Sequence, residues 1–385
     1  MKSHTNFKAK KRAVFLLLLC CSIVLNSCQS NERQLSLSTI EVDAASNDEL
    51  KLSEYFENFR MLKLPTDSVM GEIRKIQYAN SRIYISDGET MFVFSDDGQL
   101  LSCFNRKGQG PGEYLGIMDF VVNGETITVL SSRKLLTYNH SGENISTLNL
   151  EFGVASVSPT VENAYFLYCG NIAYDDKNRH KLHLMRDGQE SERFLPMDEH
   201  RAKYLFLFGT HNFYRHQDFV YFFETFNDTV YVSNDNKIEP SFYIDYKGKN
   251  IPASFFEKNY SDIAVFFGEY HKTPYAYGTS KFILYNRFLM FGSFYQKNMK
   301  LTVYDREKLI SQTFATVEDD VYFNGLTIPV SEFNYHSDKH IFVPVNAFDV
   351  IEWGKEYPMD NRFKELVDVT KEEDNPLLLI FDFKQ

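Results

Sequence analysis

The sequence is poor in residues that build metal centres or disulfide frameworks. Of its five cysteines, Cys20 and Cys21 lie in an apolar N-terminal run, and Cys103 and Cys169 stand alone in strand-like stretches, where we expect buried free thiols. Neither a Gly-x-Ser-x-Gly nor a His-Glu-x-x-His motif occurs, and no loop has the Asp-rich and Asn-rich pattern that binds calcium. The sequence therefore predicts no metal site, no cofactor and no catalytic residue, and only calcium binding in a central channel stays open as an alternative.

A long apolar run is also missing. The N-terminal run from Ala13 to Leu25 has thirteen residues, fewer than the roughly 20 that a membrane-spanning helix needs. A basic segment without acidic residues precedes it. The two together predict a signal peptide over residues 1–27.

The residues that end this run resemble the lipobox of bacterial lipoproteins. Ser27 directly precedes Cys28, and the aliphatic Leu25 stands three residues before it. The resemblance implies cleavage before Cys28 and lipidation of its thiol. A lipid there would anchor the protein in the bacterial cell envelope, which we expect to be the outer membrane, since each buried acyl CH₂ contributes about 0.8 kcal/mol. The periplasmic and surface orientations both stay open, and a cleaved secretory signal without lipid is the alternative.

The sequence also lacks an excess of positive charge. The formal net charge is −11, and cleavage before Cys28 would remove five basic residues and no acidic one, which takes it to −16. Such an acidic chain is not expected to bind nucleic acid or to carry a polybasic membrane patch. Residues 28–58 are polar and predict a flexible tether.

Helical periodicity is nearly absent beyond residue 59, where short β-branched and aromatic runs alternate with Gly, Asn and Asp turns. One unit, made of a strand, a short polar loop and a second strand, recurs six times with starts 38 to 68 residues apart. Four-stranded propeller blades repeat at roughly 40–50 residues. The pattern predicts an all-β fold, a single six-bladed β-propeller of four-stranded antiparallel blades over residues 59–385. The units begin at Ile83, Ile127, Tyr165, Val220, Phe288 and Ile341.

Both ends of the chain are expected to complete the last blade, because an open ring would leave an unpaired strand edge. The candidate strands are residues 59–64 and residues 376–383, and a helix is expected over 360–371. Two separate domains are the alternative, although no linker rich in Pro, Gly or Ser divides the strands.

The most distinctive local sequence is RKGQGPGEY, from Arg106 to Tyr114. Three glycines and a proline predict a tight turn with positive φ at glycine. No helix follows, and the Lys-Ser/Thr pair of a phosphate-binding loop is missing, so we do not expect phosphate binding.

Residues 83–120 resemble an NHL-type propeller repeat, and the whole chain resembles the six-bladed β-propeller lipoproteins of Bacteroidota. The shared features are the GxGPGEY loop, FNDTVY at 226–231, DNPLLL at 374–379 and the lipobox. The resemblance implies a propeller fold and an envelope location, but no established activity.

Candidate binding residues follow from blade geometry. The loop between the second and third strands of a blade lies on the same face as the loop to the next blade, and propellers commonly bind ligands there. For Glu113 and Tyr114 the alternative is that they satisfy the backbone of their own loop. The residues expected on this face are Asp87, Arg106, Glu113, Tyr114, Arg133, Asn227 and Asp228.

Two classes of function remain. We expect a noncatalytic binding module for a glycan, a peptide or an envelope protein, with the membrane as a further partner through the lipid anchor. The alternative is a propeller enzyme of the lyase, lactonase or hydrolase type, with residues around the central channel. A pocket with three or more converging His, Asp, Glu or Arg side chains at the channel mouth would favour the enzyme, and a broad, shallow face lined by aromatic and amide side chains would favour binding.

Overall fold

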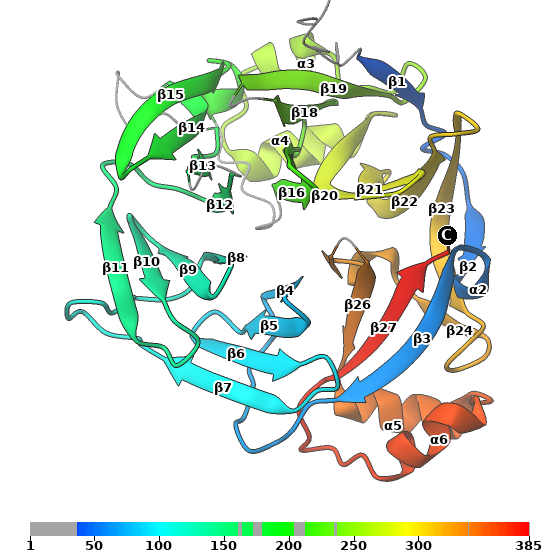
Figure 1. The fold of residues 1–385 in the computed structure, drawn as a ribbon. Coiled ribbons are helices and arrows are strands. Elements are labelled where there is room, and N and C mark those ends of the chain that lie inside the picture. The colour runs from blue at the N-terminus through cyan, green and yellow to red at the C-terminus, as the bar shows by residue number, and fades with distance from the viewer. Residues whose placement is uncertain are drawn as a thin grey trace, which may run out of the picture. The chain divides into compact units, whose positions relative to one another are not determined.

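The computed structural model describes residues 37–160, 164–171, 179–203, 212–234, 237–337 and 339–384. Their strands form six sheets, each of which runs from an inner strand to an outer one (Figure 1). All pairings within a four-stranded unit are antiparallel. The chain is an all-β propeller of small antiparallel sheets.

The first three sheets follow one another along the chain. The first contains β4 (Lys75–Ala79), β5 (Arg82–Ser86), β6 (Thr90–Ser95) and β7 (Leu100–Asn105). The second contains β8 (Asp119–Asn123), β9 (Thr126–Ser131), β10 (Lys134–Tyr138) and β11 (Asn144–Asn149). The third contains β12 (Ser156–Pro159), β13 (Tyr165–Tyr168), β14 (His180–Arg186) and β15 (Gln189–Pro196).

The other three sheets take in strands from the start of the chain. The fourth contains β16 (Phe213–His216), β17 (Phe219–Phe222), β18 (Thr229–Asn234), β19 (Lys237–Asp245) and β1 (Ser38–Glu41). The fifth contains β20 (Ala276–Tyr285), β21 (Phe288–Tyr295), β22 (Asn298–Asp305), β23 (Ile310–Asp319), β24 (Leu326–Ile328) and β2 (Asp48–Lys51). The sixth contains β25 (Tyr335–His336), β26 (His340–Val345), β27 (Leu377–Phe383) and β3 (Phe56–Lys63).

Strand position explains the burial pattern. In the first sheet, the middle strand β6 buries Met91, Phe92, Val93 and Phe94 in succession, because neighbouring sheets cover both of its faces. The outer strand β7 has exposed and part-buried residues in alternation. Cys103 lies on β7 and is exposed, so the expectation of a buried thiol there is wrong, whereas Cys169 is buried as predicted.

The predicted tether over residues 28–58 is too long. β1 pairs in parallel with β19, and β2 pairs in parallel with β23. Each of these strands buries one aliphatic side chain, Ile40 or Leu50, completely. The polar composition of this segment hid two four-residue strands that contribute a single core residue each. Cys28 and the predicted signal peptide lie outside the described residues.

Helices fill two loops of the fold. α3 (Ala253–Glu257) and α4 (Ile263–Tyr270) lie between β19 and β20, and α5 (Ala347–Glu356) and α6 (Asn361–Asp368) lie between β26 and β27. The helix predicted over 360–371 corresponds to α6. The others were missed because short aromatic-rich segments such as α4 (IAVFFGEY) read like strands. The remaining short helices are α2 (Leu52–Tyr55), η1 (Arg201–Lys203) and η2 (Val330–Glu332). Within the described ranges, no helix is long and apolar enough to span a bilayer.

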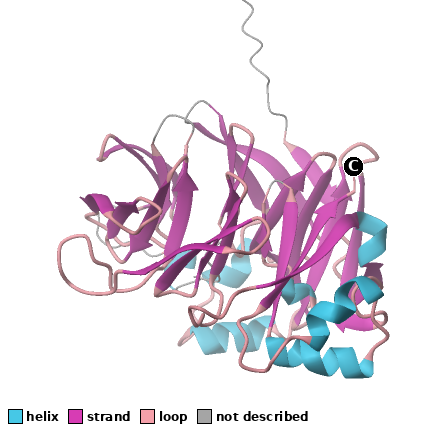
Figure 2. Cartoon of the chain, turned by 60° about the horizontal axis from the view of Figure 1, so that its bottom comes forward, coloured by secondary structure: helices cyan, strands magenta, loops and turns pink. Residues whose placement is uncertain are grey.

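The molecule has two faces, and α3 to α6 gather at one of them (Figure 2). We call this the helix face. It also carries the loops that join the second and third strands of a sheet and those that lead to the next sheet. The opposite turn face carries the tight turns after the inner strands, among them Asn80-Ser81, Gly124-Glu125 and Gln217-Asp218.

Candidate functional site

The predicted loop residues of the first sheet do share the helix face. Asp87 accepts hydrogen bonds from the backbone N–H of Thr90 (2.7 Å) and, through its other oxygen, of Gly71 (3.1 Å). The Tyr114 hydroxyl donates to the carbonyl of Glu89 (2.8 Å) and accepts from the N–H of Arg106 (3.0 Å). These side chains close the loops in which they lie.

The Glu113 side chain folds back over its own loop. Its Oε2 accepts the Gly110 N–H at 2.7 Å. A Cβ atom at Gly108 would lie 2.0 Å from this oxygen, and one at Gly110 would lie 3.0 Å from it. These two glycines are therefore needed for close packing. The positive φ in this loop, +70°, is at Gly112.

We expect Gly112→Ala to destabilise the protein more than Gly124→Ala. Both glycines have positive φ, which costs a residue with a Cβ about 1–2 kcal/mol. A Cβ at Gly124 meets nothing within 4 Å, whereas one at Gly112 would lie 2.9 Å from Asn144. Urea unfolding measures both losses. Equal losses would mean that the loop moves away from Asn144 without cost.

The other predicted residues also have partners in the fold. Asn227 donates to Glu224 Oε1 (3.1 Å) and accepts the Thr229 N–H (3.0 Å). Burial raises the pKa of Asp228 to about 6. Arg106 donates from Nε to the Gly142 carbonyl (2.7 Å), and Arg133 donates to the Glu151 carbonyl (3.3 Å). A ligand-binding role for these residues stays a prediction.

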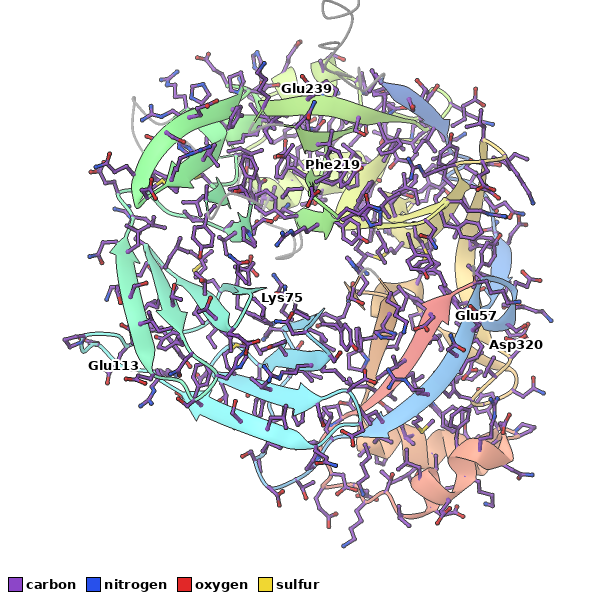
Figure 3. All side chains as sticks on the ribbon, in the orientation of Figure 1. Glu57, Lys75, Glu113, Phe219, Glu239 and Asp320 are labelled. Carbon is purple, nitrogen blue, oxygen red and sulfur yellow. The ribbon has the colours of Figure 1, made fainter. Side chains whose placement is uncertain are left out.

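A pocket of about 540 Å³ lies elsewhere, along the inner strands of the ring. Its lining comes from β4, β8, β12, β16 and β25 and from the turns that follow them on the turn face. None of the seven predicted residues lines it. Figure 3 shows this separation, with Lys75 on the inner strand β4 and Glu113 at the outer rim.

A buried ion pair joins the inner strands at the deep end of this pocket. Lys75 Nζ lies 2.6 Å from Asp119 Oδ1, and only 1% of the Asp119 side chain is exposed. Asp119 also accepts the N–H groups of Phe120 (2.8 Å) and Val157 (2.9 Å). One carboxylate thus links β4, β8 and β12, and its oxygens are fully used within the protein.

The opposite wall of the pocket is aromatic. The ring of Tyr214 on β16 lies 5.0 Å from that of His336 on β25, and the Tyr214 hydroxyl donates to the Leu284 carbonyl (2.5 Å). The buried Nδ1 of His336 has no hydrogen-bond partner among the described residues. Burial, with the nearby Lys75 ammonium, lowers the pKa of His336 to about 3, so that the imidazole is neutral at pH 7.

The lining also contains amide residues, of which Asn123 and Gln217 lie at the turn-face ends of β8 and β16, whereas Asn334 precedes β25. The amide side chains of Asn123, Gln217 and Asn334 reach the pocket, and none of them bonds to another side chain or backbone group in the part of the chain described. Phe213, the first residue of β16, also lines the pocket, at the other end of that strand from Gln217. The pocket therefore offers free amide donors and acceptors and, elsewhere in its lining, aromatic rings.

A family model described as "Domain of unknown function (DUF4934)" matches residues 37–382. The chain belongs to this family. The match begins at β1 and not at residue 59, in agreement with the corrected start of the folded part. A search of the curated proteins finds no match.

The DUF4934 chain is similar to solved structures from Bacteroides. A crystal structure of a "putative exported protein" from Bacteroides fragilis is 19% identical, with a TM-score of 0.70 over 91% of this chain and all of the other. A member of the DUF4221 family from Bacteroides vulgatus is 10% identical, with a TM-score of 0.47 over 86% of this chain and 98% of the other. The first similarity supports the propeller fold and, with it, the coarse resemblance to Bacteroides propellers.

Sequence reasoning missed the pocket residues of the DUF4934 chain. Two of the inner strands that line the pocket, β4 (KIQYA) and β16 (FYRH), are short and lack the apolar runs that marked the repeat. One available signal was position, since each such strand immediately precedes a unit start such as Ile83 or Val220. The polar residues just before each unit start were candidates for a channel lining.

Acidification should destabilise the protein through His336. Its unfolded imidazole takes up a proton below about pH 6.5, whereas the folded one, with a pKa of about 3, does not. The free energy of unfolding should therefore fall by about 2 kcal/mol more in the wild type than in His336→Gln between pH 7 and pH 5. The raised pKa values of Asp228 and Asp319 act in the opposite direction but are common to both proteins. Parallel pH profiles would contradict a neutral His336.

Proposed function

We propose that this chain is a noncatalytic binding module of the bacterial envelope that takes the end of a glycan into its channel pocket. The supporting observation is that three amide side chains without a hydrogen-bond partner among the described residues, Asn123, Gln217 and Asn334, line a pocket that also contains aromatic residues. Amide groups pair with sugar hydroxyls as both donors and acceptors, and apolar surface with a few polar groups is typical of small-ligand sites.

The size of the pocket favours a glycan over an envelope protein. Its volume of about 540 Å³ lies within the range of roughly 300–1,000 Å³ of small-ligand sites. A stable protein partner needs about 800 Å² on each side. A narrow pocket along the inner strands does not provide such a surface.

The chemistry of the lining favours binding over the alternative of a lyase, lactonase or hydrolase. Asp119 has its oxygens taken by Lys75 and two backbone N–H groups, so it is poorly placed to accept a substrate proton. His336 has a pKa of about 3, far below the value near working pH that suits a general base. Arg215 is the third His, Asp, Glu or Arg among the described lining residues, and its guanidinium group is not a proton acceptor.

The proposal also covers the number of propeller blades, the closure of the ring and the lipid anchor. We take the six sheets as six blades with NHL-like repeats, and the ring as closed by both chain ends. The pairing of β27 with both β26 and β3 supports this. The lipobox supports a lipid at Cys28 and an outer-membrane location, and the exported-protein description of the similar Bacteroides fragilis chain is in keeping with secretion.

A glycan array of neutral and acidic oligosaccharides tests the binding role. We expect residues 37–385 to retain at least one of them, and Asn123→Ala with Asn334→Ala to weaken its binding at least fivefold, since each lost hydrogen bond costs about 1 kcal/mol. Gln189→Ala, an exposed amide on a turn of the same face but outside the pocket, is the matched control. An array without any retained glycan, or an equal loss in the control, would overturn the proposal.

A further inference from the structure

We infer that the glycan carries an anionic group, which Arg215 and Lys339 bind at the mouth of the pocket. This inference rests on the proposed function and names the ligand class. The charged groups of the lining are Lys75, Arg215, Lys339 and Asp119. Among the described residues, three cations and one carboxylate line a pocket in a chain whose formal net charge is −11.

The carboxylate of Asp119 does not neutralise the positive charge at the mouth of the pocket. Asp119 is paired with Lys75 at 2.6 Å, deep in the pocket. Arg215 and Lys339 are both exposed, and neither forms an ion pair or a side-chain hydrogen bond with any described residue. The mouth therefore has two positive charges available to a ligand.

Topology places these two cations toward the same face of the molecule. The ring contact between Tyr214 and His336 (5.0 Å) brings β16 and β25 together. Both strands run toward the turn face from that contact. Arg215 follows Tyr214 by one residue, and Lys339 lies in the turn after His336. Both cations thus lie between the ring contact and the turn face.

The two side chains suit a carboxylate or a sulfate. The guanidinium group of an arginine binds such planar or branched anions through two parallel N–H donors, and a lysine adds a mobile point charge. The free amides beside them would then bind the hydroxyls of the same sugar. Neutral His336 adds no charge, and its Nδ1, which has no partner among the described residues, is available for a hydrogen bond.

Titration calorimetry with trigalacturonate and its methyl ester, esterified at every carboxylate, tests this, because esterification removes the charges and adds only methyl groups. We expect the acid to bind at least fivefold more tightly than the ester. A sulfated disaccharide, measured in the same way, shows whether a sulfate group can replace the carboxylate. Arg215→Gln and Lys339→Gln should lower the affinity for the acid to that for the ester and so remove the preference for acid. Lys308→Gln, an exposed cation on another turn of the same face, is the control.

The outcomes separate the two proposals. If the ester or other neutral glycans bind as tightly as the acid, or if Arg215→Gln and Lys339→Gln keep the preference for acid, the inference is overturned while the glycan site stands. If no saccharide of either kind binds, the proposed function itself has failed.

Discussion

Deleting residues 377–385 should prevent the protein from folding. β27 is the third strand of its sheet and pairs with β26 on one side and β3 on the other (Figure 1). All seven of its residues are buried, and six of them are apolar. Each apolar side chain contributes about 1.5–3 kcal/mol, and together they match or exceed the roughly 5–15 kcal/mol that stabilises a domain.

Circular dichroism and thermal melting of residues 37–376 against residues 37–385 measure this effect. Residues 37–383, which keep all of β27, are the control and should melt close to the parent. A cooperative transition of residues 37–376 at the parent temperature would show that β27 is peripheral to the fold.

Breaking the Lys75–Asp119 pair should be the second large effect. Asp119→Asn leaves a largely buried ammonium without its counter-charge, and Lys75→Met leaves a buried carboxylate. Removing one partner of a buried pair costs about 3–5 kcal/mol. The double variant should cost clearly less than the sum of the two single ones, because it leaves no unpaired buried charge.

Urea unfolding of the four proteins gives the coupling free energy. The exposed pair Lys355–Glu352, treated with the same double-mutant cycle, should show no measurable coupling. Additive losses at Lys75 and Asp119 would show that the pair does not connect β4 to β8 energetically.

The fold was predictable where strands are buried on both faces. The six unit starts found in the sequence, from Ile83 to Ile341, all lie in the second strand of a sheet. Such strands are continuous apolar runs because neighbouring sheets cover both sides. β1 and β2 were hidden for the opposite reason, since each contributes one buried aliphatic residue to an otherwise polar segment.

The candidate site was not predictable in the same way. The inner strands face the pocket and are polar, so their residues resemble turns in the sequence. The GxGPGEY loop was conspicuous in the sequence because its backbone requires glycine at particular positions. Gly112 takes positive φ, and Gly108 makes room for Glu113. These requirements come from the conformation and packing of the loop, and they give no information about a ligand.

A crystal structure of residues 37–385 with the tightest-binding glycan of the array tests the central claim most directly. We expect the sugar in the channel pocket, within hydrogen-bond distance of Asn123 and Asn334. A sugar bound instead on the helix face, beside Arg106 or Asp228, would contradict the channel site and return the loop residues to the centre of the function.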